Sequence, residues 1–343
     1  MRRTNIRFQC NYCEWRCDLS GGKPGVCRMY EESQGTIRER FPHRWSSCMP
    51  SRIESIPFYH VRPGSRALVI GTMGCNFSCR YCSNAFIAKE DPTLVEERML
   101  LLSPAEMVRK ARQMGCGSIV FNVNEPAMSF PSLLELAETA RAEDIPLGCL
   151  TNAYTTEEST EMLASIFSFF NIGLKGLSTA FNRDFIGIPS VEPILRNIRR
   201  LAATSHVEVT TPIIESVNDN ELGEMSRFLA DVDPEIPWHV FRLLPEDEMK
   251  ESCYPDIETI AGALESVRSI LPYVYFHNFV GSEWVNTHCP GCGALVIERF
   301  SLGCGGDKLK SFHCVGRGCQ DCGRQIRLAG DVEYSWKHGE VQR

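Results

Sequence analysis

Three cysteines at close spacing constrain this sequence more than any other feature. Cys75, Cys79 and Cys82 follow a C-x3-C-x2-C pattern directly after the apolar run 67–71. A short apolar run of this kind predicts a buried strand, so we expect the three thiolates in a loop at the end of a sheet. Cysteine thiolates at such spacings bind iron–sulfur clusters. A zinc knuckle is the alternative, but it normally needs a fourth Cys or His nearby, and the serine and asparagine that follow do not supply one.

The overall composition is that of a large globular chain. Its 343 residues are enough for one α/β domain with small appendages. The formal net charge is −7 without a long basic run, so composition does not indicate nucleic-acid binding. No apolar segment approaches the roughly 20 residues of a membrane span, and the first residues do not read as a secretory signal. We therefore expect a cytoplasmic protein without membrane contacts.

Seventeen cysteines are many, and most of them are clustered. In a cytoplasmic protein such clustering favours metal sites over disulfides. The first group consists of Cys10, Cys13, Cys17 and Cys27, and turn-forming residues before the last of these allow the chain to fold back. Four cysteines in so short a segment fit one tetrahedral site, and we predict a zinc-binding module over residues 1–66. An additional iron–sulfur cluster is the alternative, which spacing alone does not exclude.

A second cysteine-rich segment occupies the other end of the chain. It contains two C-x2-C-G knuckles, formed by Cys289, Cys292, Cys319 and Cys322. The glycine after each pair permits the tight turn in which backbone N–H groups face the thiolates. Two such knuckles predict a zinc-ribbon or rubredoxin-like module over residues 289–343, with zinc or iron bound. Two further cysteines, at positions 304 and 314, have no assigned role.

Between these groups, short apolar runs alternate with amphipathic stretches. The expected strands are 67–71, 118–123, 146–151, 170–175, 206–213, 238–243 and 273–277. The expected helices are 104–115, 131–143, 155–168, 191–204, 219–231 and 256–270. Strands that alternate with helices form a parallel sheet with right-handed crossovers. Because the units are fewer than the eight of a closed barrel, we predict an α/β fold, a partial (β/α)6 TIM-like barrel over residues 67–288, with function at the carboxyl ends of its strands.

Polar residues follow the ends of the first expected strands. Glu125 comes after 118–123, where its carboxylate would accept charge-assisted hydrogen bonds from an ammonium group. The alternative is that the carboxylate of Glu125 stabilises the N-terminus of a helix by interacting with the helix dipole. Thr151 and Asn152 follow the next strand, and Lys175 follows the one after it, although a solvated lysine would look the same.

The later strands carry further candidates. Strand 206–213 alternates polar and apolar residues, and either the set with Thr210 or the opposite set points inward. His239 is a candidate catalytic residue, although a lone histidine is more often structural. Arg242 is a candidate for binding an anionic substrate bidentately.

The cysteine triad and the strand ends resemble the radical S-adenosylmethionine (SAM) superfamily. In that superfamily the open iron of a [4Fe–4S] cluster chelates the amino and carboxylate groups of SAM. The segment Asn122-Val123-Asn124-Glu125-Pro126 resembles a Gly-Gly-Glu-Pro-like motif that holds the SAM amino group, with both glycines replaced. The resemblance therefore assigns Asn124 and Glu125 to cofactor binding.

Three other positions are assigned by the same resemblance. Thr151 and Asn152 correspond to a Thr-Asn-Gly segment near the SAM ribose or carboxylate, with Ala153 in place of the glycine. Lys175 would pair with the SAM carboxylate, in a segment where relatives read Asp-Leu-Lys and this chain has Gly173. Tyr81 lies where the superfamily places an aromatic ring beside the adenine; as a core aromatic it would look the same.

A closer resemblance is to the AmmeMemoRadiSam-system radical SAM proteins, relatives of the pyruvate formate-lyase activating enzymes. It rests on the N-terminal cysteine spacing and on segments 71–77, 124–126, 208–211, 237–239 and 286–293, and it covers nearly the whole chain. It implies an oxidoreductase-type enzyme of anaerobic chemistry, in which reductive cleavage of SAM yields a 5′-deoxyadenosyl radical that abstracts hydrogen from a small-molecule or peptide substrate.

Two other functions stay open, and partners follow from the chemistry. One is activation of a glycyl-radical enzyme, which would be a protein partner, and the other is a non-catalytic metal-binding scaffold. A reducing protein such as flavodoxin or ferredoxin is the expected electron donor.

Overall fold

The computed structural model describes residues 7–333, and an eight-stranded sheet forms its centre. The strands of this sheet are β4 (Ser47–Arg52), β5 (Arg66–Gly71), β7 (Ser118–Phe121), β8 (Leu147–Thr151), β9 (Phe169–Gly173), β10 (His206–Ile213), β11 (Trp238–Arg242) and β12 (Val274–His277). They are ordered β12-β11-β10-β9-β8-β7-β5-β4. All neighbours from β5 to β12 are parallel, whereas β4 is antiparallel to β5. Because β12 pairs only with β11 among the described strands, the barrel is open.

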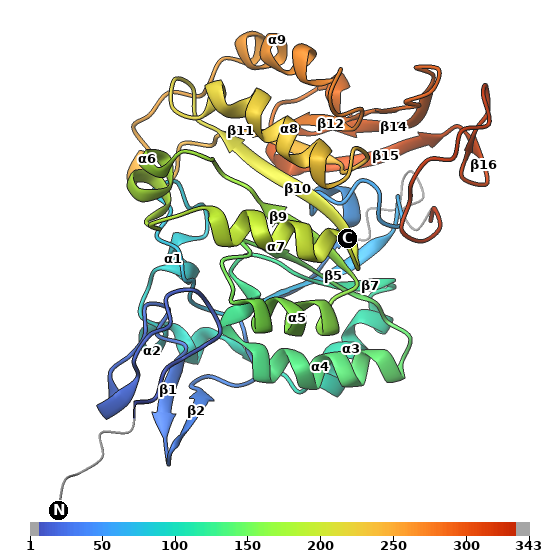
Figure 1. Ribbon diagram of the computed structural model, residues 1–343. Helices are drawn as coiled ribbons and strands as arrows, with labels where there is room; N and C mark the ends of the chain where they lie inside the picture. The colour runs from blue at the N-terminus through green and yellow to red at the C-terminus, as the bar shows by residue number, and fades with distance from the viewer. Residues whose placement is uncertain (1–6, 334–343) are drawn as a thin grey trace, which may run out of the picture.

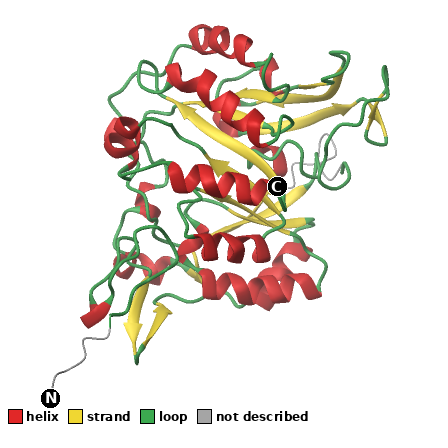
Figure 2. Cartoon of the chain, viewed as in Figure 1, coloured by secondary structure: helices red, strands yellow, loops and turns green. Residues whose placement is uncertain are grey.

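Six helices connect the parallel strands and cover one face of the sheet (Figure 1). They are α3 (Pro104–Gln113), α4 (Phe130–Ala142), α5 (Glu157–Ile166), α7 (Glu192–Ala202), α8 (Leu222–Val232) and α9 (Ile257–Val267). Each contacts the next one along this series, so that they form a continuous layer. Figure 2 shows this helical layer in red against the yellow strands. The apolar sides of the helices and the strands between them form the main core.

The predicted α/β partial barrel is confirmed, with a seventh parallel strand after the six strand–helix units. Every expected strand and helix of the barrel is present, because the local signals are strong. For example, Ser103 and Glu106 form a reciprocal capping box at the start of α3. Helix α8 begins later than expected because the residues just before it, Asp219–Glu221, form a 3₁₀ turn.

Smaller elements lie at both ends of the barrel. The N-terminal ones are β1 (Tyr30–Ser33), β2 (Thr36–Glu39) and β3 (Arg44–Trp45), and β3 pairs with β6 (Leu100–Leu101). Short helices α1 (Ala85–Ala88), α2 (Pro92–Val95) and α6 (Thr179–Phe181) lie in loops after β5 and β9. The C-terminal ones are β13 (Thr287–His288), β14 (Leu295–Ser301), β15 (Asp307–Phe312), β16 (Cys314–Val315) and β17 (Gly318–Cys319). The predicted N-terminal module therefore supplies β4 to the central sheet, and its boundary at residue 66 stays a prediction.

No helix in the described part of the chain is long and apolar enough to cross a membrane.

Candidate active site

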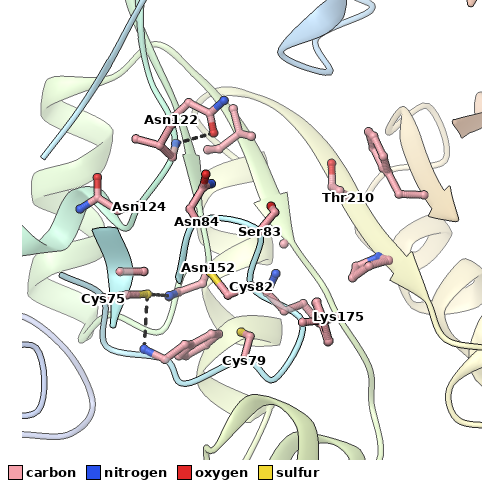
Figure 3. A pocket seen from close by; sticks show the side chains of 18 of the residues that line it. Cys75, Cys79, Cys82, Ser83, Asn84, Asn122, Asn124, Asn152, Lys175 and Thr210 are labelled. Atoms are coloured by element: carbon pink, nitrogen blue, oxygen red, sulfur yellow. Dashed lines mark hydrogen bonds between the residues drawn. The ribbon is translucent and has the colours of Figure 1, made fainter. Parts of the chain in front are cut away.

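A cavity of about 440 Å³ lies at the carboxyl ends of the parallel strands. The loop after β5 and the ends of β7 to β12 line it (Figure 3). It brings together almost all the predicted residues of the barrel, namely Cys75, Cys79, Tyr81, Cys82, Asn124, Glu125, Thr151, Asn152, Lys175, Thr210 and Arg242. A volume of this size is typical of sites for small molecules and cofactors.

A left-handed turn at Gly74 and hydrogen bonds of the Asn124 side chain hold the loop that carries the three cysteines. Gly74 has a φ of +73°, a conformation that favours glycine. The side chain of Asn124 donates to the carbonyl oxygens of Met73 and Gly74 at 2.9 and 3.0 Å, and its Oδ1 accepts the N–H of Thr72 at 2.9 Å. Asn124 therefore fastens the cysteine loop to the end of β7, in addition to lining the cavity.

The three thiols of the barrel are not gathered as closely as the ligands of a single metal ion. Among the described residues, the cysteine sulfurs that lie within 4.8 Å of one another are those of Cys289, Cys292, Cys319 and Cys322. The sulfurs of the barrel triad do not form such a group. Zinc holds its thiolates at about 2.3 Å and hence close together, whereas a four-iron cluster separates its ligands more widely. The triad therefore fits a [4Fe–4S] cluster with one iron open to another ligand.

The sulfur of Cys75 already accepts hydrogen bonds within the loop and from the neighbouring strand end. The N–H of Phe77 lies 3.4 Å from it and the Nδ2 of Asn152 lies 3.8 Å from it (Figure 3). Burial and the charge of Glu125 raise the pKa of Cys75 well above its ordinary value, and the hydrogen bond from Phe77 offsets part of this rise.

Glu125 is a buried carboxylate at the edge of this site, with only 2 % of its surface exposed. Its Oε2 accepts the N–H of Asn152 at 2.7 Å, and its Oε1 accepts the hydroxyl of Thr151 at 2.9 Å and the N–H of Ala127 at 3.3 Å. Burial raises the pKa of Glu125 to about 7, and these hydrogen bonds offset part of that rise. A buried carboxylate of this kind is suited to accept hydrogen bonds from an amino group.

Lys175 and Tyr81 lie on the side of the cavity next to Cys79. The Nζ of Lys175 lies 5.9 Å from the centre of the Tyr81 ring. Burial raises the pKa of Cys79, and the charge of Lys175 partly offsets this effect. Lys175 thus lines the cavity with a positive charge near Cys79, where it can attract a carboxylate.

Two non-glycine residues adopt positive φ where the resemblance expects glycine. Val123 has a φ of +77° and Ala153 a φ of +53°. For a β-branched residue this is a genuine outlier. The backbone shape of both segments is therefore retained without glycine, and the replacements do not displace Glu125 or Asn152 from the cavity.

The opposite end of the cavity is formed by Arg242, Thr210 and residues that the sequence analysis did not select. The Nη2 of Arg242 donates to the carbonyl oxygen of Asn278 at 3.4 Å, whereas its buried Nε has no hydrogen-bond partner among the described residues. Thr210 donates to the Oδ1 of Asn171 at 2.6 Å. Asn171 interrupts an otherwise apolar strand, a signal that could have identified it.

The structure does not bring His239 to this cavity. His239 is fully buried near the amino end of β11, where its Nε2 lies 2.6 Å from Oε2 of Glu208 and its Nδ1 lies 3.0 Å from Nε2 of His277. Glu208 also accepts the N–H groups of Tyr59 and His60. The assignment of His239 as a catalytic residue is therefore corrected. Burial lowers the pKa of His239 to about 4. Through Glu208, His239 connects the sheet to the segment after β4.

The C-terminal cysteines form a compact set, as their two knuckles predicted. The sulfurs of Cys289 and Cys322 lie 3.5 Å apart, and those of Cys292 and Cys319 lie 3.6 Å apart. Cys314 lies opposite Cys319 in the β16–β17 pair, outside this set. Four sulfurs at this spacing fit one tetrahedral metal ion.

Comparison with known proteins agrees with this geometry. Residues 69–229 match the model of the Radical SAM superfamily. This segment is therefore a radical SAM domain. The chain is 27% identical over 327 residues to the uncharacterized protein MJ0808 of Methanocaldococcus jannaschii, covering 94% of this chain and 96% of that one.

More distant similarities span between half and two thirds of the chain. A probable GTP 3′,8-cyclase of Pyrococcus horikoshii is 24% identical over 174 residues, which is 50% of this chain and 54% of that one. Among solved structures, Streptococcus suis SuiB bound to its precursor peptide SuiA is similar with a TM-score of 0.49 and 14% identity, covering 65% of this chain and 48% of SuiB.

Proposed function

We propose that this radical SAM enzyme cleaves SAM reductively and abstracts a hydrogen atom from an anionic small molecule or peptide. The observation that carries the proposal is the single cavity in which three cluster-spaced thiols, the buried Glu125 and two cationic side chains meet. When bound, the [4Fe–4S] cluster and SAM supply a 5′-deoxyadenosyl radical. The protein's part is to bind, orient and shield these groups from water.

The cavity residues divide into three tasks. Cys75, Cys79 and Cys82 hold the cluster. Glu125 accepts hydrogen bonds from the amino group of SAM, and Lys175 attracts its carboxylate. This division follows from their places around the cavity, since the carboxylate and the cation lie on separate strand ends.

Arg242 is the group that we assign to the substrate. Its buried Nε has no hydrogen-bond partner within the described residues, although the rest of the guanidinium contacts Asn278 and the ring of Tyr254. A buried donor without a partner is unfavourable by about 1–3 kcal/mol. A carboxylate or phosphate of the substrate would supply the missing acceptor, which favours an anionic substrate.

The first experiment tests SAM cleavage. Anaerobically reconstituted protein is incubated with SAM and dithionite, and 5′-deoxyadenosine and methionine are measured, with the Cys75→Ala/Cys79→Ala/Cys82→Ala variant as the control. We expect both products from the wild type and neither from the variant. Absence of 5′-deoxyadenosine from wild-type protein with full iron content, also in the presence of a cell extract, would favour the non-catalytic scaffold instead.

A second experiment tests the class of substrate. A deuterium-labelled cell extract is fractionated by anion exchange, and deuterium in 5′-deoxyadenosine is measured for the wild type, for Arg242→Gln and for the exposed-site control Arg98→Gln. We expect deuterium transfer from fractions that bind the column, and at least a tenfold loss in R242Q alone. Transfer from the unbound fraction, or full transfer by R242Q, would exclude an anionic substrate held by Arg242.

A cytoplasmic flavodoxin or ferredoxin is the electron donor that we propose.

A further inference from the structure

The N-terminal cysteines lie beside the loop that carries the cluster ligands. At Gly74 an added Cβ would lie 2.8 Å from the carbonyl oxygen of Cys27 and 2.7 Å from Cγ of Met29, so the two loops are in close contact. On another side, Cys13 forms a β-bridge with Thr155, shortly after the end of β8. The N-terminal segment is therefore packed against both walls of the cluster site.

Backbone N–H groups face sulfur atoms in all three cysteine sets. In the N-terminal set, the sulfur of Cys17 accepts the N–H of Val26 at 3.4 Å. Cys75 and Cys289, which belong to the other two cysteine sets, each accept a backbone N–H in the same way. Donors of this kind stabilise thiolates.

The spacing of these sulfurs distinguishes a cluster from a single zinc ion. Tetrahedral zinc at about 2.3 Å from each sulfur places the sulfurs about 3.8 Å apart. The C-terminal set has this spacing. In the described residues no three of the N-terminal sulfurs lie within 4.8 Å of one another, although they are close enough for their charges to interact. The sulfurs of the barrel triad likewise do not form a group within 4.8 Å of one another.

One buried residue connects the N-terminal segment to the loop of the barrel triad. Asn76, only 1 % exposed, accepts the Nε1–H of Trp15 at its backbone carbonyl oxygen at 2.8 Å, and Trp15 lies two residues after Cys13. The Oδ1 of Asn76 lies 3.9 Å from the sulfur of Cys75 and accepts the Nδ2 of Asn152 at 2.7 Å. The segment that carries Cys13 and the loop that carries Cys75 thus meet at Asn76.

We propose that Cys10, Cys13, Cys17 and Cys27 hold a second [4Fe–4S] cluster that passes electrons to the cluster at Cys75, Cys79 and Cys82. A one-electron reductant of the flavodoxin or ferredoxin class reduces the second cluster from the 2+ to the 1+ state. That electron moves to the first cluster, which becomes 1+ while the second returns to 2+, and no bond forms or breaks in this step. The relay rests on the proposed function, whereas the presence of the second cluster does not. The zinc predicted for these residues is replaced by iron in this proposal.

Metal content tests the second cluster independently of SAM cleavage. Four proteins are reconstituted anaerobically with iron, sulfide and zinc: the wild type, Cys75→Ala/Cys79→Ala/Cys82→Ala, Cys13→Ala/Cys27→Ala, and the control Cys289→Ala/Cys292→Ala. We expect about eight irons in the wild type and the control, and about four in each of the other two variants. If the barrel triple variant contains no iron and the wild type binds zinc in its N-terminal set, the second cluster is excluded, even if the Cys13/Cys27 variant does not fold.

Electron paramagnetic resonance tests the contact between the two clusters. In fully reduced wild type, two neighbouring 1+ clusters interact, so its spectrum should be broadened and split relative to the sum of the spectra of the two single-cluster variants. A wild-type spectrum equal to that sum would overturn the relay. Failure of SAM cleavage with both clusters present and coupled would instead contradict the proposed function and leave the second cluster established.

Discussion

Replacing Glu125 by glutamine tests whether this carboxylate binds the amino group of SAM. In E125Q the amide oxygen can still accept the N–H of Asn152, which lies 2.7 Å from the wild-type carboxylate. The amide nitrogen then faces Thr151, whose hydroxyl can rotate from donor to acceptor. Only the longer contact from Ala127, at 3.3 Å, is lost. The fold should therefore tolerate the substitution, while the negative charge disappears.

The expected size of the effect follows from the charge. A hydrogen bond to a charged group contributes about 1.5–3 kcal/mol, which corresponds to a change of about 10- to 100-fold in dissociation constant. Because burial raises the pKa of Glu125 to about 7, the wild type carries this charge only at higher pH. The ratio of the SAM dissociation constants, E125Q over wild type, should be about 10–100 at pH 8 and should fall toward one below about pH 6.

Equilibrium dialysis of SAM with reconstituted, anaerobic protein measures this ratio. Iron per chain must be equal in the two proteins, so that the cluster is not the cause. The exposed Glu138 on α4 provides a matched control, because Glu138→Gln makes the same change in net charge far from the cavity. Dissociation constants that agree within twofold at pH 8, or a ratio that does not change with pH, would refute the role of Glu125.

Three further predictions concern stability, measured by urea unfolding. Val123→Gly should raise the free energy of unfolding by about 1 kcal/mol, because the left-handed conformation at φ +77° is unfavourable for valine; a loss of stability would contradict this. Glu208→Ala should lower it by roughly 3–6 kcal/mol, because it leaves the buried N–H groups of Tyr59, His60 and His239 without an acceptor; a loss below about 1 kcal/mol would disagree. Burial raises the pKa of Glu54 to about 7 in the folded protein. As the pH rises above the ordinary glutamate pKa, ionisation therefore favours the unfolded chain. The free energy of unfolding of Glu54→Gln, relative to that of the wild type, should be about 2–3 kcal/mol higher at pH 8 than at pH 5. An unchanged difference between the two pH values would contradict that assignment.

The barrel could be predicted from local patterns because each of its elements carries its own signal. The apolar run 67–71 and the capping box at Ser103 are examples, and both correspond to observed elements. Most of the cavity could also be predicted, since the carboxyl ends of parallel strands meet at one edge of the sheet. Asn171 was missed, although its polarity inside an apolar strand marks it.

His239 was misassigned because the sequence pattern does not determine depth along a strand. It precedes Arg242 by three residues, which at about 3.3 Å per residue places it roughly 10 Å from the cavity end of β11. Its side chain lies between Glu208 and His277, and both come from other strands. Only long-range contacts determine such an environment.

The sequence by itself determined the order of strands and helices, the cysteine groups and the chemistry of the strand ends, because these depend on neighbours along the chain. Which side chains lie together depends on the tertiary structure. Cys13 and Cys75 are far apart in sequence, and the hydrogen bond from Trp15 to the carbonyl oxygen of Asn76, which joins their segments, exists only after folding. The distances between sulfurs, which separate a zinc ion from a cluster, likewise arise only from the packed loops.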